Sequence, residues 1–164
     1  MIEIRQMVDS DAEYIVEFNK GTDKDFLNQW AGRFYTYPIT TEQITTRIKN
    51  TANTRYFTIL MNNEVIGTCE LDFINWDTQE CSVCRFLLSS SYRGLGYGTK
   101  SLNLIVEYAF NELNMKKVKL SVFHFNTGAK RCYEKAGFIV VGEAIRPNGW
   151  VALQMEISNH SNNI

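Results

Sequence analysis

Three glycines at alternate positions form the part of this sequence with the clearest capacity for chemistry. Gly94, Gly96 and Gly98 lie in YRGLGYGTKSL, between an apolar run predicted to be a strand and a stretch predicted to be a helix. Free backbone N–H groups at a helix start attract anions, and glycine lets a phosphate approach the backbone. Arg93 adds a cation beside them. The stretch predicts a phosphate-binding loop; the alternative is a tight turn that needs glycine only for its backbone conformation.

Two common nucleotide-binding motifs do not match this loop. The dinucleotide motif requires G-x-G-x-x-G, but Gly98 comes one residue early and Thr99 occupies the expected position. No acidic residue follows about twenty residues later at the end of the next predicted strand. A Walker A loop requires G-x-x-x-x-G-K-[ST], but here Thr99 precedes Lys100. The loop is therefore expected to hold another phosphate carrier.

A second segment, NTGAKRCYEKAGF, narrows the choice of ligand. The RGLGYG loop resembles R/Q-x-x-G-x-G/A, the acetyl-CoA pyrophosphate loop of the GNAT superfamily of N-acetyltransferases. The second segment, residues 126–138, is similar to that family's N-x-x-A-x-x-x-Y-x-K-x-G-F, and one predicted helix and one predicted strand separate the two motifs. The resemblance covers Ile2 to Ile157. It is weakest from Thr22 to Thr54, where such enzymes build their acceptor sites.

The resemblance implies that two parts of the chain hold acetyl-CoA. The backbone of the glycine loop would take the pyrophosphate, and the preceding strand would pair with the pantetheine arm through its backbone. Asn126, at the start of the next helix, would bond the same arm, and a plain helix N-cap is an equal alternative. The expected cofactor-binding residues are Phe86, Leu87, Leu88, Arg93, Gly94, Leu95, Gly96, Tyr97, Gly98, Thr99, Asn126 and Tyr133.

Tyr133 and Glu80 are the expected catalytic residues. Tyr133 matches the family's tyrosine, whose hydroxyl would protonate the leaving thiolate as a general acid; the alternative is an aromatic packing residue. Some members place a glutamate eleven residues before the R/Q of the loop, but counting back from Arg93 gives Ser82. Glu80 lies two residues earlier, on the same face of the strand, and could deprotonate the amine through a water chain.

Other carboxylates and thiols are less suited to these roles, or serve as alternatives. Glu70 and Asp72, on the preceding predicted strand, are alternative bases, and a solvated surface charge is the alternative for all three acids. Cys81 and Cys84 form a C-x-x-C, but residues three apart on a strand point to opposite faces, so no metal site is expected. Without a converging histidine, Cys84 is not expected to act as a nucleophile. The histidine closest to the motifs, His124, is expected at the rim or in the core.

An aromatic-rich segment follows the first predicted helix. Its aromatic side chains could wall an acceptor pocket and favour a cationic amine through cation–π contacts. The alternative is a hydrophobic core beneath a loop. The residues concerned are Phe26, Trp30, Phe34, Tyr35 and Tyr37.

Composition indicates one globular domain. The chain has 164 residues, 45% of them hydrophobic, and a formal net charge of −1, with no basic block that would indicate a nucleic-acid partner. The apolar runs are too short to cross a bilayer, and the N-terminus lacks the pattern of a signal peptide, so we expect a cytoplasmic protein without a membrane partner. The expected domain covers 1–157, followed by a polar tail, 158–164.

The predicted elements follow the order β-α-α-β-β-β-α-β-α-β-β, with hairpins at Asn62–Asn63 and at RPNG. The glycine-loop helix is expected over roughly Gly96 to Asn114 from its apolar periodicity. This is an α/β (α+β) fold with a mixed, mostly antiparallel seven-stranded sheet and about four helices. The resemblance adds that the two central parallel strands splay apart, with the thioester in the gap.

The resemblance implies an N-acetyltransferase in which a primary amine attacks acetyl-CoA directly, with no acyl-enzyme. The acceptor would be an amine-bearing small molecule or a protein N-terminus. The alternatives are a noncatalytic acyl-CoA-binding or sensor domain and a nucleotide-binding regulator. Many relatives form homodimers, for which this sequence holds no specific signal.

Overall fold

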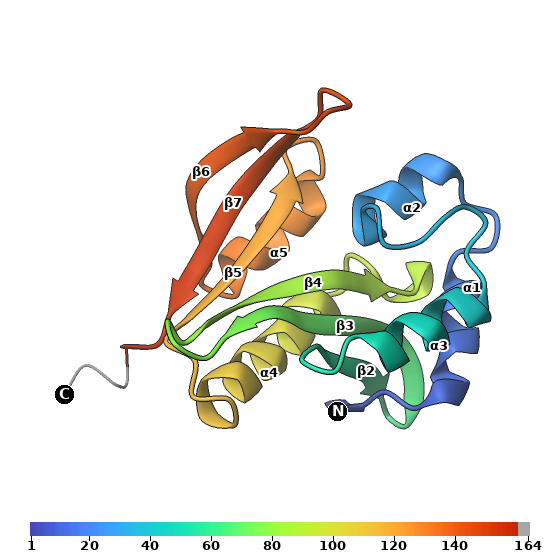
Figure 1. Ribbon diagram of the computed structural model, residues 1–164, viewed down its shortest axis with the longest axis horizontal. Coiled ribbons are helices and arrows are strands. Elements are labelled where there is room, and N and C mark those ends of the chain that lie inside the picture. Colours follow the sequence, from blue (N-terminus) through green and yellow to red (C-terminus); the bar gives the residue numbers. More distant parts are fainter. Residues whose placement is uncertain (161–164) are drawn as a thin grey trace.

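A single seven-stranded sheet forms the centre of the molecule, in the computed structural model that describes residues 1–160 (Figure 1). The strand order is β1-β2-β3-β4-β5-β7-β6, and every pair is antiparallel except β4–β5. This confirms the predicted mixed, mostly antiparallel sheet. The strands are β1 (Ile2–Gln6), β2 (Arg55–Met61), β3 (Glu64–Asn75), β4 (Glu80–Leu88), β5 (Lys117–Phe123), β6 (Ile139–Ile145) and β7 (Val151–Ser158).

Five α-helices cover the sheet within the described residues, one more than the sequence suggested. The difference arises in the ambiguous aromatic-rich segment, where the Asp23 side chain accepts a hydrogen bond from Phe26 N–H and starts a helix, α2. Two short 3₁₀ turns, Asp9–Asp11 and Ser90–Tyr92, accompany them. The helices are α1 (Ala12–Phe18), α2 (Lys24–Ala31), α3 (Thr41–Asn50), α4 (Tyr97–Asn111) and α5 (Thr127–Lys135).

Local sequence signals explain several element boundaries. Asn62 and Asn63 both adopt positive φ, 50° and 70°, as a two-residue hairpin turn between β2 and β3 requires. Thr40 caps α3 by accepting a hydrogen bond from Gln43 N–H at 3.3 Å. In the turn between β6 and β7, Gly149 N–H donates to Arg146 O at 2.9 Å. These turns confirm the two predicted hairpins.

Two hydrophobic cores lie on opposite faces of the sheet. The larger packs α4 against the strands and includes Leu71, Leu102 and Phe138, all almost fully buried. The smaller lies beneath α1, α2 and α3 and includes Ile15 and Ile44. Each face of the sheet is therefore covered by helices (Figure 1).

The only parallel pair in the described sheet separates after three residues. Glu80 pairs with Lys117, Cys81 with Val118 and Ser82 with Lys119, and no further pairing joins β4 to β5. Beyond this point the two strands diverge (Figure 1). The expected splay is thus present, and residues 83–88 of β4 have a strand neighbour on the β3 side alone.

A β-bulge lies on the diverging part of β4. Thr68 of β3 pairs with Leu87 and Glu70 with Cys84, so Arg85 and Phe86 together stand opposite Cys69. Arg85 has a positive φ of 48°, an uncommon conformation for a residue other than glycine. The extra residue reverses the alternation of faces, and the Arg85 side chain turns toward the face that carries Glu70.

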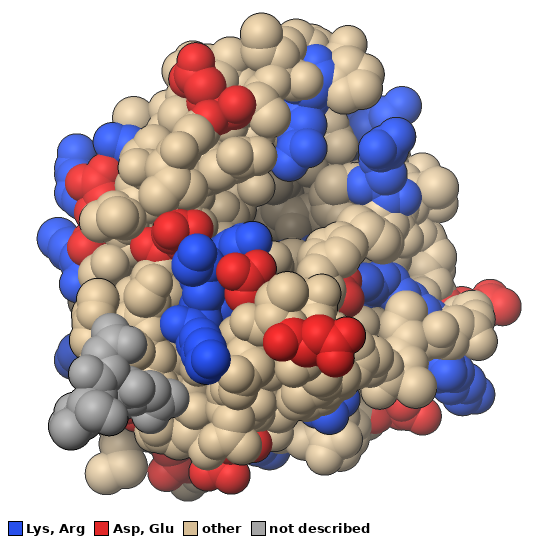
Figure 2. All heavy atoms as spheres, turned by 60° about the vertical axis from the view of Figure 1, so that its left-hand side comes forward, with Lys and Arg blue, Asp and Glu red and all other residues tan. Residues whose placement is uncertain are grey.

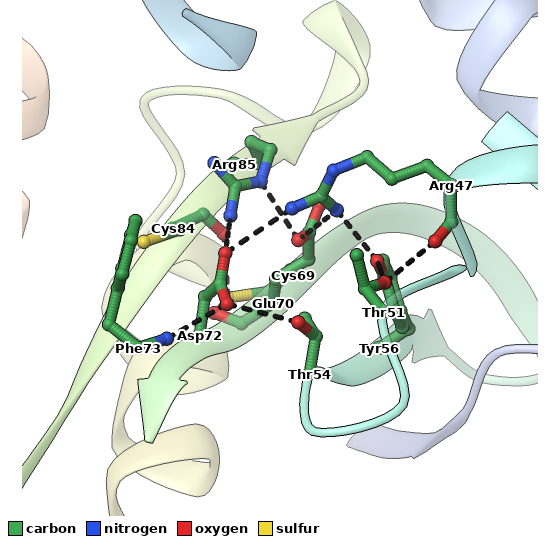
Figure 3. A network of polar contacts seen from close by, with 10 residues as sticks. All are labelled: Arg47, Thr51, Thr54, Tyr56, Cys69, Glu70, Asp72, Phe73, Cys84 and Arg85. Carbon is green, nitrogen blue, oxygen red and sulfur yellow. Dashed lines mark hydrogen bonds and ion pairs between the residues drawn. The ribbon is translucent and has the colours of Figure 1, made fainter. Parts of the chain in front are cut away.

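The bulge completes a buried network of four charges (Figure 3). Glu70 Oε1 lies 2.6 Å from Arg47 Nη1 and 2.8 Å from Arg85 Nε. Asp72 Oδ2 accepts from Arg85 Nη2 and from Arg47 Nη2, the latter at 3.2 Å. Both guanidinium groups also lie over the Phe34 ring, at 4.7 and 4.1 Å from its centroid. The network joins α3 and the segment before it to β3 and β4.

No helix within residues 1–160 combines the length and the apolar character that a membrane span requires. Residues 161–164 of the expected C-terminal tail, 158–164, fall outside the described residues, and the domain limits stay a prediction.

We predict that Arg47→Ala lowers the free energy of unfolding by about 3 kcal/mol, because it leaves the buried Glu70 and the half-buried Asp72 sharing one guanidinium group. Urea denaturation would measure the loss. Lys20→Ala, which removes an exposed ion pair with Glu17, is the control and should cost much less. Equal losses in the two variants would show that the buried network adds no stability.

Candidate active site

A cleft of about 1540 Å³ opens where β4 and β5 part. Its walls come from α2, β4, the glycine loop, β5, α5 and the turn between β6 and β7. The surface is visibly hollowed on this side of the molecule (Figure 2). The cleft brings together both segments that the sequence analysis selected, the glycine loop and residues 126–138.

The last three residues of β4, Phe86 to Leu88, are apolar, so they offer a ligand their backbone rather than functional side chains. Leu87 and Leu88 are buried, and the half-buried Phe86 ring lies 6.3 Å from that of Tyr133. Because residues 83–88 have no β5 partner, their backbone groups on that side are available to a ligand. This arrangement suits an extended ligand that pairs with β4 like a further strand.

The three loop glycines serve two different structural needs. Gly94 and Gly96 have φ values of 74° and 86°, and a Cβ at either would meet no heavy atom within 4 Å. Gly98 is helical, but a Cβ there would lie 3.0 Å from Cys132 Sγ and 3.4 Å from Leu88 Cδ1. Gly94 and Gly96 thus shape an open loop, whereas Gly98 permits close packing of α4 against α5.

The loop has the features of an anion-binding helix start. Gly96 is the N-cap of the fifteen-residue helix α4, and no side chain caps it. The N–H groups of the first helical turn, from Tyr97, therefore remain for a ligand or water. Leu95, between the two positive-φ glycines, has an exposed side chain, and neither it nor Tyr97 is among the described residues that line the cleft.

Arg93 is held in place by the protein rather than free at the mouth. Its Nε donates to Leu88 O at 3.0 Å, and its guanidinium group lies 5.1 Å from the centre of the Phe26 ring. Arg93 thus ties the glycine loop to the end of β4 and to α2. Its two terminal nitrogens, Nη1 and Nη2, keep N–H groups that can bind an anion in the cleft.

Asn126 lines the cleft and caps α5. Its side-chain oxygen accepts a hydrogen bond from Ala129 N–H at 3.3 Å. Within the described part of the chain, its side-chain NH₂ group has no hydrogen-bond acceptor. The two expected roles use different atoms of the same side chain, so they are compatible.

Tyr133 presents a neutral phenol to the cleft. Its buried ring lies against Phe86 and Phe138, with centroids 6.3 and 6.4 Å away. Among residues 1–160, none hydrogen-bonds its hydroxyl group. Burial, with smaller contributions from Cys132 and other thiols, raises the pKa of Tyr133 well above its usual value. The hydroxyl is therefore protonated and available as a donor.

Glu80 lies outside the set of residues that line the cleft. Its carboxylate is 2.9 Å from Lys119 Nζ and 3.7 Å from Lys117 Nζ. The hydrogen bond from Lys119 lowers the pKa of Glu80 below its usual value. The alternatives Glu70 and Asp72 are held in the buried network and are likewise absent from the lining. None of these placements favours direct proton abstraction in the cleft.

The cysteines show no sign of nucleophilic activation. Cys84 lines the cleft, but burial raises its pKa to about 12, so the thiolate is scarce at neutral pH. His124 is exposed, packs against Phe125 and lies outside the lining residues. Cys81 is buried in the larger core, the one that packs against α4. Residues 1–160 contain no group of three side chains suited to hold a metal ion.

Several cleft residues were not identified from the sequence. Arg33, Arg85 and Arg146 all contribute to its walls. Arg85 reaches the site through the bulge, for which the sequence carries no turn residue or other signal. Among the predicted aromatics, Phe26, Trp30 and Phe34 line the cleft, whereas Tyr35 is buried in the smaller core and the Tyr37 hydroxyl bonds Thr22 O.

Residues 24–138 match the family model described as the acetyltransferase (GNAT) family. The matched region runs from α2 to the end of the second motif, so it includes the glycine loop and Tyr133.

Curated relatives match over shorter stretches. The probable N-acetyltransferase YjcK of Bacillus subtilis is 32% identical over 77 residues, 47% of this chain and 42% of the relative. An aminoglycoside N(6')-acetyltransferase type 1 of Klebsiella pneumoniae is 38% identical over 65 residues, 40% and 32% of the two chains. The spermidine N(1)-acetyltransferase of Escherichia coli is 34% identical over 89 residues, 54% and 47%. The matched stretch spans less than half of each of these relatives.

Two solved structures share the fold. The spermidine N-acetyltransferase of Vibrio cholerae, in complex with CoA and spermine, has a TM-score of 0.81 at 20% identity, covering 96% of this chain and 95% of that one. An aminoglycoside acetyltransferase in complex with coenzyme A has a TM-score of 0.78 at 24% identity, covering 99% and 98%.

Proposed function

The chain belongs to the GNAT family of acetyltransferases, and we propose that it transfers an acetyl group from acetyl-CoA to a primary amine. The observation that carries the proposal is the cleft between β4 and β5, which has the glycine loop and the unbonded Tyr133 hydroxyl on its walls. The proposed catalytic unit is one domain over residues 1–157.

The described residues fit the parts of acetyl-CoA. The N–H groups at the start of α4, and the open space around Gly94 and Gly96, suit the pyrophosphate. The unpaired edge of β4 suits the amides of the pantetheine arm. The free NH₂ group of Asn126 can donate to a carbonyl of the same arm. The thioester would then lie between β4 and α5, close to Tyr133.

In the proposed reaction, the amine nitrogen forms a bond to the thioester carbonyl carbon and the carbon–sulfur bond breaks. The electron pair of that bond leaves with sulfur, which takes a proton from the Tyr133 hydroxyl. The nitrogen loses one proton to water, and Tyr133 regains a proton from solvent. The products are an amide and the CoA thiol.

Tyr133 fits the general-acid role because of its environment. Its phenol is protonated at neutral pH, and the hydroxyl has no competing acceptor among the described residues. The Phe86 and Phe138 rings hold the side chain in place. The noncatalytic acyl-CoA-binding alternative gives no reason for an unbonded hydroxyl at this position, so we favour the enzyme.

For the acceptor amine we propose no direct carboxylate base. Glu156 is the one acidic residue among the described lining residues, and Lys117 lies 3.6 Å from it. The amine would therefore enter as the small uncharged fraction present at neutral pH. Glu80, acting through water from outside the cleft, is the alternative, which the activity of Glu80→Gln can test.

We predict that Tyr133→Phe lowers kcat by roughly 100-fold or more, the usual contribution of a general acid. The KM for acetyl-CoA should change little, because phenylalanine keeps the ring contacts. Thiol release from acetyl-CoA measures both quantities. An unchanged kcat in Tyr133→Phe would rule out Tyr133 as the general acid. Binding of CoA by the unaltered protein without turnover of any amine would favour the noncatalytic sensor domain.

Asn126 allows its two roles to be separated. Asn126→Asp keeps the oxygen that caps α5 but loses the NH₂ donor, whereas Asn126→Ala loses both. We predict that both variants raise the KM for acetyl-CoA, and that Asn126→Ala alone lowers the melting temperature. A normal KM in Asn126→Asp would limit this residue to capping.

We predict that kcat/KM rises with pH up to the pKa of the acceptor amine and that Glu80→Gln leaves this alkaline limb unchanged. The physical reason is that the amine itself, rather than a protein carboxylate, must lose the proton. Acceptors of different amine pKa should shift the limb accordingly. A large fall in kcat/KM of Glu80→Gln over the whole pH range would instead support the water-mediated base.

A further inference from the structure

The cleft carries a large excess of positive charge. Seven basic side chains line it, against Glu156 as the one acidic residue among the described lining residues. Glu156 is moreover 3.6 Å from Lys117. The basic residues are Arg33, Arg85, Arg93, Lys119, Arg131, Lys135 and Arg146.

Five of these cations have another use. Arg85 is neutralised in the buried network, and Lys119 lies 2.9 Å from the Glu80 carboxylate. The other three belong to the glycine loop and α5, where the proposed cosubstrate brings its phosphates: Arg93, Arg131 and Lys135.

Neither a carboxylate partner nor the proposed cosubstrate accounts for the other two cations, Arg33 and Arg146. Arg33 follows α2, and Arg146 opens the turn between β6 and β7. These two segments face each other across the gap above β4 (Figure 1), and basic side chains flank the hollow on the surface (Figure 2). Both side chains are exposed, and neither forms an ion pair with a carboxylate of residues 1–160.

The aromatic wall offers little to a cationic acceptor. The Phe34 ring is already covered by two guanidinium groups, those of Arg47 and Arg85. The Phe26 ring has Arg93 at 5.1 Å. Two of the three expected aromatic side chains that line the cleft, Phe34 and Phe26, are therefore already in contact with the protein's own arginines. A polyamine entering here would meet cations where it requires carboxylates or free aromatic faces.

We infer that the acceptor amine carries an anionic group, a carboxylate or a phosphate, and that Arg33 and Arg146 bind it. This inference rests on the proposed acetyl transfer. Each guanidinium group offers paired N–H donors that match the oxygens of either anion. The arginines would hold the anionic end at the rim while the uncharged amine points toward Tyr133.

Matched acceptors test the charge requirement. We would compare ω-amino acids of increasing chain length with their methyl esters, aminoalkyl phosphates with the corresponding amino alcohols, and spermidine as the polycation. Values of kcat/KM would be calculated per uncharged amine, so that differences in amine pKa do not enter. An anionic acceptor should exceed its neutral partner by roughly 10-fold to 100-fold, the range expected for charge-assisted hydrogen bonds. The carboxylate and phosphate series identify the preferred anion.

Variants test the assigned residues. Arg33→Gln with Arg146→Gln should bring each pair of acceptors to near parity while leaving the KM for acetyl-CoA unchanged. Lys49→Gln with Lys116→Gln removes the same two charges at exposed positions outside the cleft; this double variant is the control and should keep the preference. Added salt should weaken the preference in the unaltered protein.

The outcomes separate this inference from the proposed function. Turnover of spermidine or of the neutral partners at rates equal to or above the anionic acceptors would overturn the inference and leave acetyl transfer intact. A raised KM for acetyl-CoA in the double variant would also overturn it, because the arginines would then serve the cosubstrate. Absence of thiol release with every amine would contradict the proposed function itself.

Discussion

The separation of β4 from β5 after Ser82 is the constraint on which the rest of the site depends. Two parallel strands that stayed paired would satisfy each other's backbone groups and leave no cleft. Once they part, the groups of residues 83–88 must find another partner, because unpaired backbone groups in a closed site are costly. The opening that exposes them also brings Tyr133 and the glycine loop to a common space. The cleft is thus a property of the sheet, and the side chains around it select the chemistry.

The bulge at Arg85 connects this opening to the acceptor side. It turns a guanidinium group toward Glu70 and Asp72, and those carboxylates also hold Arg47 of α3. Buried carboxylates require such partners, since an isolated buried charge is strongly unfavourable. Helix α3 is therefore fixed to β3 and to β4, the strand that forms one wall of the cleft. The same arginines lie over Phe34, which sets the character of the wall that an acceptor meets.

Local signals in the sequence predicted most of the elements, because turns and helix caps depend on a few neighbouring residues. The hairpin at Asn62–Asn63 and the start of α4 near Gly96 are examples. The bulge was not predictable, since a one-residue register shift follows from pairing with β3 and not from the local sequence. For the same reason, the ion pairs of Glu80 with Lys117 and Lys119 emerged only when β5 was placed beside β4. The periodicity of apolar residues indicated which face of its own helix or strand each residue occupies, but it could not show which elements pack against each other.

Electrostatics gives the clearest case of a property that composition conceals. The chain is nearly neutral, with 17 basic and 18 acidic residues, and its composition indicated no anionic partner. Seven of the basic side chains but one acidic side chain line the cleft, which leaves 10 and 17 for the rest of the protein. Walls of low dielectric focus the field of such a cleft, so local charge governs what enters it even when the net charge is close to zero. In the proposed complex the cosubstrate's phosphates take the cations at the glycine-loop end, so the remaining pair across the opening points to the chemistry of the acceptor.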